Sequence, residues 1–460
     1  MDDLRNISTT WLAPPFASLN IEANCTAATD WLAARIEQIA GGDPYRDGTL
    51  YTGIAYLNSA IPATWTPKPT SADLAAWYID VWAGSEYGVD EALDGARDRA
   101  TQFAYFGCGG MVCGKLDWQG DDNVSGIGMM VSYYLAAALA TVYFLVLVPS
   151  RLGYYRSLPT RSPRLVDAFR ESANTFLDTA LIFAVAMLGA AVVRYARVLR
   201  RREEDYSAYA LLGSTAMSAF SIFPAVMLQA VADGLRGRFL RQFLWALVIG
   251  LTVAVEGMYA HLIPHDPRYD GGAVYQLFEE LHQYSQYVWL VVCEANTLRG
   301  YLRDAITVAH VTLGISVVWW LYYVVSSLAG AETRAKVHRL KVWELWARSR
   351  PWLRVAGGVM SFGSMWALII VFSQYRSEVM GLSGRSNEDD RWTFGQVLSL
   401  ATWCPVMVDY VAVLIYGPER GLSERLSRRY QVVATKDTEE KNTSSPESIR
   451  YDRIDRMATV

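Results

Sequence analysis

The sequence lacks the motifs by which many soluble enzymes are recognised. It contains no GxxxxGK[ST], GxSxG, HExxH or CxxC pattern, and its five histidines are scattered along the chain. ATP hydrolysis, a metal centre and a bound cofactor are therefore not expected. Charge is also scarce, at 19% of residues, and the net charge of −4 gives no general attraction to nucleic acid.

The chain also begins without a recognisable leader. The opening residues, MDDLRNISTTWLAPPF, contain no apolar core of the length that a cleavable signal peptide needs. If the first part of the chain is exported, we expect the first apolar span to act as the insertion signal.

Long apolar stretches are what the sequence does contain. Ser125–Pro149 carries no charged residue and is long enough to cross about 30 Å of hydrocarbon as a helix. Six further stretches follow, so the sequence predicts an all-α membrane protein with seven transmembrane helices. The predicted spans are 125–149, 173–193, 207–230, 242–259, 305–328, 355–375 and 394–416.

The spans divide the chain into three predicted parts. Residues 1–124 form a small, mostly helical, extracytoplasmic domain, residues 125–416 form the transmembrane bundle, and residues 417–460 form a cytosolic amphipathic helix with a disordered tail. Within the first part, helical spacing predicts helices after Thr29, over 71–82 and over 90–106. The Gly, Pro and Thr content of 41–70 favours loops or short strands there.

The distribution of Lys and Arg predicts the orientation. The loops at 150–172 and 329–354 and the tail are richer in these residues than the loops on the other side, although Arg194–Arg202 is an exception. The positive-inside rule then places the N-terminus outside and the C-terminus in the cytosol of a plasma-membrane or endomembrane protein. The basic, Trp-rich segment 329–354 is typical of a segment lying on an anionic leaflet.

Sequons and cysteines gather in the part predicted to be extracytoplasmic. Asn6 and Asn24 are the expected glycosylation sites, and Asn123 has the same sequon but lies almost at the membrane. The cysteines predicted to form disulfides in an oxidising compartment are Cys25, Cys108, Cys113 and Cys293.

Four such cysteines allow three connectivities. The preferred arrangement pairs Cys25 with either Cys108 or Cys113 and pairs Cys293 with the other, which would attach the domain to the bundle. A local Cys108–Cys113 bridge is one alternative. Four reduced thiols in a cytosolic domain, with the N-terminus inside, are the other.

Four carboxylates at membrane depth are the candidate catalytic residues, because an ionisable group there is costly and often functional. Three of them fall in the predicted cytosolic half and could face one cavity. Alternatively, they pair with Arg170, Arg236 or Arg420, or meet water near the helix ends. The four are Asp178, Asp233, Asp409 and Glu256.

Paired aromatic residues in the fifth span are the candidate ligand-binding residues. Their ring faces could stabilise a cation, or they could simply fill the bundle or an interfacial belt. They are Trp319, Trp320, Tyr322 and Tyr323. In the seventh span, Cys404-Pro405 predicts a helix distortion with a buried thiol.

Two stretches carry a resemblance to a known group. SGIGMMVSYYL at the first span and WTFGQVLSLATW…YGPERGLSERLSRRY at the last resemble a large family of uncharacterised polytopic membrane proteins of filamentous fungi. The resemblance runs from about Cys108 to Tyr430 and implies a multi-span membrane protein without a known chemistry. Some fungal membrane proteins of similar layout are terpene cyclases of secondary metabolism.

Two functional hypotheses follow. The first is a membrane sensor, ligand-binding protein or scaffold, because an outer domain, seven spans and a basic tail are common to many receptors. The second is a membrane-embedded cyclase or isomerase, in which Asp178 or Asp409 protonates a prenyl-type substrate and aromatic rings shield the cation. The expected partners are the lipid bilayer and an apolar or prenyl-type small molecule, and the sequence does not indicate a protein partner.

Overall fold

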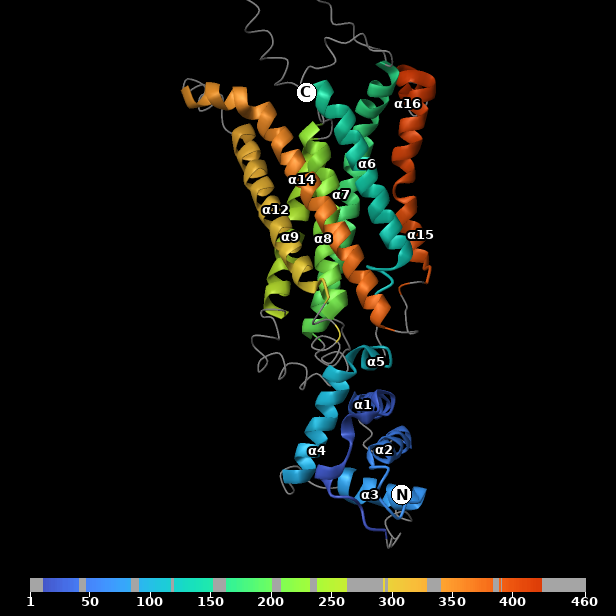
Figure 1. Cartoon of the computed structure of the whole chain (residues 1–460). Helices are drawn as coiled ribbons and strands as arrows, with labels where there is room; N and C mark the ends of the chain where they lie inside the picture. The colour runs from blue at the N-terminus through green and yellow to red at the C-terminus, as the bar shows by residue number, and fades with distance from the viewer. Residues whose placement is uncertain are drawn as a thin grey trace, which may run out of the picture.

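The structure is a computed structural model in which every described element is a helix. It describes residues 11–40, 47–83, 91–116, 120–151, 163–200, 208–231, 238–262, 293, 297–328, 341–383, 389 and 391–423. Figure 1 shows two groups of helices, a small one formed by the first part of the chain and a bundle of long helices beyond it.

The small group, residues 11–116, is called the N-terminal unit here. Its α-helices are α1 (Cys25–Ala40), α2 (Asp47–Ala60), α3 (Ser71–Trp77), α4 (Glu91–Gln102) and α5 (Gly109–Cys113). Helix α1 packs against α2, α4 and α5, and its Trp31 is buried on the Tyr56 ring, with the ring centroids 5.3 Å apart. The expectation of loops or short strands over 41–70 is wrong for 47–60, because α2 buries Tyr56 and Leu57 as one apolar face of a helix.

A buried arginine is part of this unit's interior. The Arg97 guanidinium of α4 donates hydrogen bonds to the backbone carbonyls of Val81 and Trp82 and lies beside Asp94. These partners satisfy its donors where water does not reach.

Among the described residues after the N-terminal unit, seven helices or helix pairs are long and apolar enough to cross a membrane. They confirm the predicted number of spans. They are α6 (Ile127–Arg151), α7 (Pro163–Arg200), α8 (Ala208–Val231), α9 (Arg238–Leu262), α12 (Arg299–Leu328), α14 (Lys341–Leu382), and α15 (Phe394–Ala401) followed by α16 (Cys404–Ser423).

Helix α8 is the axis of this bundle. It packs against α6, α7, α9, α12 and α14. In its most apolar stretch 94% of the residues are buried, whereas the corresponding share in α9 is 17%. The outer helices therefore present apolar side chains outward, as helices surrounded by lipid do.

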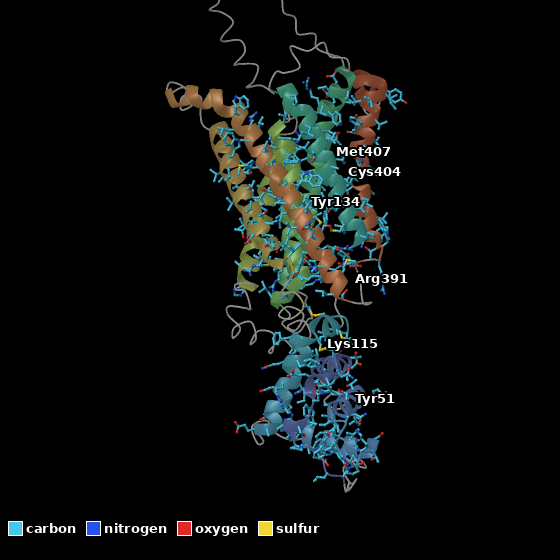
Figure 2. The ribbon with its side chains drawn as sticks, in the orientation of Figure 1. Tyr51, Lys115, Tyr134, Arg391, Cys404 and Met407 are labelled. Carbon is cyan, nitrogen blue, oxygen red and sulfur yellow. A yellow bond between two sulfur atoms is a disulfide. The ribbon has the colours of Figure 1, made fainter. Side chains whose placement is uncertain are left out.

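The seventh span departs from a single helix. The chain leaves α15 at Ala401, turns through Thr402 and Trp403, and resumes as α16 at Cys404, followed by Pro405. The predicted distortion is present, but the predicted burial of the Cys404 thiol is wrong. Cys404 is exposed together with Met407, one turn further along α16, and Figure 2 labels both.

Helices α7 and α14 extend beyond the predicted spans. Helix α7 has 38 residues and α14 has 42, whereas about 20 suffice to cross a bilayer. Figure 1 shows α14 beginning with a short stretch that runs across the end of the bundle before the helix turns along it. That stretch falls within 329–354, the segment predicted to lie on the membrane surface.

Candidate functional site

The structure contains two disulfides, one within the N-terminal unit and one between this unit and the chain just before α12. Cys25 at the start of α1 is bonded to Cys108, and Cys113 at the end of α5 is bonded to Cys293, with Cα–Cα distances of 5.6 and 5.8 Å. This is one of the two pairings that the preferred arrangement allowed. The second bridge ties the unit to the chain just before α12, so the unit is attached to the bundle both there and through the segment that leads into α6.

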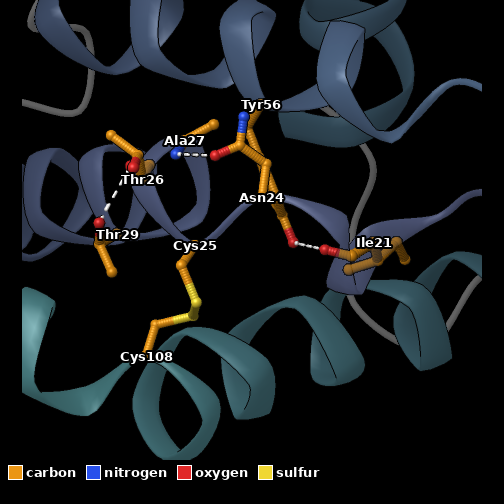
Figure 3. Close-up of a disulfide and its surroundings, with 8 residues drawn as sticks. All are labelled: Ile21, Asn24, Cys25, Thr26, Ala27, Thr29, Tyr56 and Cys108. Atoms are coloured by element: carbon orange, nitrogen blue, oxygen red, sulfur yellow. Dashed lines mark hydrogen bonds between the residues drawn. A yellow bond between two sulfur atoms is a disulfide. The ribbon is translucent and has the colours of Figure 1, made fainter.

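Figure 3 shows the surroundings of the first disulfide. The Asn24 side chain, just before α1, accepts a hydrogen bond from the Ala27 backbone N–H over 3.1 Å, as an N-cap residue does. Asn24 is exposed and Thr26 completes its sequon. The other expected glycosylation site, Asn6, lies outside the described residues.

A cluster of buried charges lies where the N-terminal unit meets the bundle. We call this cluster the junction. It joins the segment before α6 to the ends of α7 and α14, the start of α8 and the loop before α15. Its members are Asp121, Ser125, Arg194, Tyr209, Arg376 and Asp389.

Asp121 and Asp389 hold the junction together across 268 residues of sequence. The Asp121 backbone N–H donates to the Asp389 carboxylate over 2.8 Å, and the Asp121 side chain pairs with Arg194 of α7. Arg376 of α14 donates to the Ser125 carbonyl over 2.5 Å and lies 3.7 Å from Asp389 Oδ2. The junction therefore contains two carboxylates and two guanidinium groups in mutual contact.

Asp389 is the most buried acid of the junction, with 0% of its residue surface exposed. It also accepts a hydrogen bond from the Tyr209 hydroxyl over 3.2 Å. Burial raises the pKa of Asp389 above its ordinary value of 3.8, although its contacts with Ser125, Arg376 and Tyr209 act in the opposite direction. Desolvation thus outweighs the favourable contacts at this carboxyl group.

Next to the junction, the start of α6 packs closely on α15. The Gln396 amide oxygen accepts a hydrogen bond from the Gly128 N–H over 3.0 Å, and its amide nitrogen donates to the Asp122 carbonyl over 2.8 Å. A Cβ on Gly128 would lie 2.7 Å from Gln396 and from the Trp392 ring. Further along, the Trp403 indole N–H donates to the Ser132 hydroxyl over 3.1 Å.

These contacts join two stretches that are far apart in the sequence, one at the start of the first span and one at the start of the seventh. Gly126, Gly128 and Ser132 belong to SGIGMMVSYYL, and Gln396 and Trp403 belong to WTFGQVLSLATW. The sequence did not single out the junction, because no local pattern pairs Asp121 with Asp389. The closely spaced glycines of SGIG were the available signal, since glycine in an apolar helix often marks a close approach of another segment.

Two of the candidate catalytic carboxylates lie at the same level of α7, Asp178 as a residue of α7 and Asp409 as a residue of α16 that contacts α7. The Arg241 guanidinium of α9 donates to both oxygens of Asp178, over 2.6 and 3.1 Å, and to the Asn174 side chain. Asp409 of α16 accepts a hydrogen bond from Thr175. Asp178 thus has an arginine partner, but it is Arg241 and not one of the three arginines expected, and Asp233 lies outside the described residues.

The fourth carboxylate forms a contact between two outer helices. Glu256 Oε1 of α9 lies 2.7 Å from His310 Nε2 of α12, and both side chains are partly exposed. The scattered histidines of the sequence do not predict this contact, because only the fold brings His310 beside Glu256.

The aromatic candidates lie on α12. Trp319 and Trp320 are partly buried, and Trp320 packs against the hydrophobic core. Tyr322 and Tyr323 are in the same helix, but their side chains lie outside the described part of the structure. Within that part, no three His, Cys, Asp or Glu side chains are placed to hold a metal ion.

No protein-family model, curated protein or solved structure matches this chain. The disulfides, the junction and the bundle are therefore the features of the chain that bear on its function.

Proposed function

We propose that this multi-pass membrane protein is a membrane sensor or ligand-binding protein. Its N-terminal unit lies outside the cytosol and transmits its state to the bundle through the junction. The single observation that carries the proposal is the Cys113–Cys293 bridge. This bond connects the unit to the bundle at a second point, in addition to the chain segment that leads into α6. A movement of the unit can therefore reach the bundle by two covalent routes.

The same disulfides support the extracytoplasmic location. Disulfides form and persist in oxidising compartments, and four of the five cysteines are paired in two bridges at one end of the molecule. The helix ends that flank the basic loops predicted to be cytosolic, such as Arg151 of α6 and Pro163 of α7, lie at the other end of the spans. The two criteria agree on the orientation.

The junction supplies a route for transmission. The segment 120–126 leads directly from the unit into α6, and its Asp121 and Ser125 contact α7, α14 and the loop before α15. Removing one member of a buried charge pair leaves its partner uncompensated, which is strongly unfavourable. A movement of the unit would therefore shift several helices together rather than one loop alone.

No observation favours the cyclase hypothesis. Both oxygens of Asp178 are occupied by Arg241, and Asp409 is engaged by Thr175.

Thiol labelling of intact, unreduced membranes tests the location. We expect a membrane-permeant maleimide in mild detergent to label Cys404 alone, and to label Cys25, Cys108, Cys113 and Cys293 only after reduction. Labelling of all five without reduction would contradict both the disulfides and the outer location of the unit.

Amide hydrogen exchange tests transmission. We expect Cys113→Ser/Cys293→Ser to raise exchange at the ends of α7 and α14 around Arg194 and Arg376. Cys25→Ser/Cys108→Ser, which leaves the tether to the bundle intact, serves as the control and should raise exchange mainly in the N-terminal unit. Unchanged exchange in α7 and α14 of the first variant would overturn transmission through the bridge.

A further inference from the structure

We propose that α8, α9 and α12 together bind a neutral lipid that carries a hydroxyl or carbonyl group, in the half of the bundle remote from the N-terminal unit. The inference rests on the proposed ligand-binding function and deepens it, because it places the ligand site in the bundle.

The packing of the outer helices gives the first observation. Helix α9 packs mainly on α7, helix α12 packs mainly on α14, and each also packs on α8. Glu256 and His310 join α9 to α12 near the N-terminal unit. Most residues in the apolar stretches of α9 and α12 are not buried by other helices, so lipid can approach the region between these two helices.

Helical spacing relates the polar residues of α9 and α12 to the residues of known contacts on the same helices. On α12, Trp320 continues the buried stripe of Leu302, Ile306, Ala309 and Leu313 at intervals of three and four residues. On α9, Gln242 precedes Glu256 by two heptads and lies on the same edge of the helix, the edge that meets α12. At 1.5 Å per residue these two α9 residues are about 21 Å apart, which is comparable to the length of a lipid tail.

Unpaired polar atoms give the second, independent observation. Four side-chain atoms in this half of α8, α9 and α12 are buried and have no hydrogen-bond partner among the described residues. Two are donors and two are acceptors: Trp245 Nε1, Trp320 Nε1, Gln229 Oε1 and Gln242 Oε1. Trp245 is itself more than nine-tenths buried. A buried polar atom without a partner is unfavourable and calls for a bound water or ligand to satisfy it.

The chemistry of these atoms defines the ligand class. A hydroxyl group both accepts from an indole N–H and donates to an amide oxygen, and a carbonyl accepts from the indoles. Among the described side chains, Arg241 is paired with Asp178 and Glu256 with His310, so neither ion pair offers a free counter-ion to a charged headgroup. The exposed side chains of α9 and α12 include Phe243, Val311 and Ile315, so the approach from the bilayer is apolar. A neutral lipid such as a sterol or a diacylglycerol meets all of these conditions.

Photocrosslinking of the full chain tests the proposal. Two probes are used in separate phosphatidylcholine vesicles, a photoactivatable sterol and a photoactivatable diacylglycerol, and the crosslinked peptides are identified by mass spectrometry. We expect one of the two to label α8, α9 and α12 and to be displaced by its unlabelled counterpart. The probe that labels identifies the source of the hydroxyl or carbonyl group.

Matched variants show whether the unpaired atoms make the site. Gln242→Leu/Trp320→Phe should lower the displaceable labelling about tenfold, corresponding to about 1.4 kcal/mol. Gln374→Leu/Trp352→Phe changes the same residue types at exposed positions of α14 and should leave labelling unchanged. Equal labelling in both variants, or labelling spread over all outer helices without displacement, would overturn the proposal.

Thermal unfolding in detergent, with and without added lipid, gives a second readout. If a lipid satisfies the four atoms, added lipid should raise the Tm of the unmodified chain and should raise that of Gln242→Leu/Trp320→Phe much less. An equal rise in both would show that the lipid does not bind through these atoms, which would also overturn the proposal. Neither readout depends on which side of the membrane holds the N-terminal unit, so this proposal and the proposed function can fail separately.

Discussion

The N-terminal unit and the bundle are both helical, but they are stabilised in different ways. The unit has short helices around a core of Trp31, Leu57 and Leu93, and a disulfide joins two of its segments. The bundle has long helices around α8, and its exposed side chains include Val253 and Ile415, which would be unfavourable in water. Aromatic contacts occur in both, so they do not distinguish the two regions.

The difference shows how the surrounding medium selects the stabilising interactions. In water a small unit gains from burying apolar area and from covalent bonds, because its core is limited in size. In lipid the apolar driving force between helices is absent, so close packing and buried polar contacts hold the helices together. Thr175 with Asp409 and Ser132 with Trp403 are contacts of the second kind.

The largest expected effect is on the N-terminal unit alone. We expect Cys25→Ser/Cys108→Ser to lower the free energy of unfolding of the unit by about 2–5 kcal/mol, because the bridge closes a loop of 83 residues. Trp31 and Trp82 are buried in the unit, so its denaturant-induced unfolding can be followed by tryptophan fluorescence.

Far-ultraviolet circular dichroism of the same samples reports mainly on the long helices. It should change little in this variant, because the bridge lies wholly within the unit. A parallel loss of bundle helicity would show that the two regions unfold as one, and the contrast between them would disappear.

The second prediction addresses close packing in the bundle. Gly128→Ala should destabilise the chain by about 1–3 kcal/mol, because its Cβ would lie 2.7 Å from Gln396 and Trp392 in a region without free space. Gly250→Ala on α9 is the matched control, since its Cβ meets nothing within 4 Å, and it should be neutral or stabilising. Thermal unfolding in detergent compares them, and equal Tm values would contradict the packing argument.

The third prediction concerns pH at the junction. Burial raises the pKa of Asp389 in the folded chain, so the folded state binds this proton more tightly than the unfolded state does. As pH falls from the raised pKa of the folded chain to the ordinary value of 3.8, the unmodified chain should gain stability relative to Asp389→Asn. Below the ordinary value the stability difference should stay constant. A stability difference that does not vary with pH in this window would show that Asp389 is not buried as described.

The sequence predicts those features that local patterns determine. Hydropathy alone identifies all seven spans, since a stretch without charge such as 125–149 has few alternatives to crossing a bilayer. Counting cysteines on one side of the topology favours the long-range pairing, but it leaves open the choice between Cys108 and Cys113, a local Cys108–Cys113 bridge and four reduced thiols.

Tertiary partners are what the sequence does not predict. Asp178 pairs with Arg241 because α9 packs on α7 at that level, and no spacing rule favours Arg241 over Arg170. Asp121 and Asp389 meet only because the ends of several helices converge. Cys404 is exposed rather than buried because α16 lies at the edge of the bundle, and the rotation of a helix follows from its neighbours.

The smallest expected effect separates a structural role of Asn24 from its role as a glycosylation acceptor. Asn24→Gln should cost about 1 kcal/mol, because the longer side chain is a poor N-cap for α1, and it also removes the sequon. Asn24→Ser removes the sequon but keeps a good cap, and Thr26→Ala removes the sequon while leaving the Asn24 contact in place. If the unit lies outside the cytosol, all three variants should lose the same glycosidase-sensitive mobility shift.

Thermal unfolding of the deglycosylated proteins then tests the cap, and only Asn24→Gln should lose stability. Equal stability of Asn24→Gln and Thr26→Ala would contradict the capping role. A mobility identical to that of the unmodified chain in all three would leave the N-terminal unit without a glycan at this position and count against its predicted location.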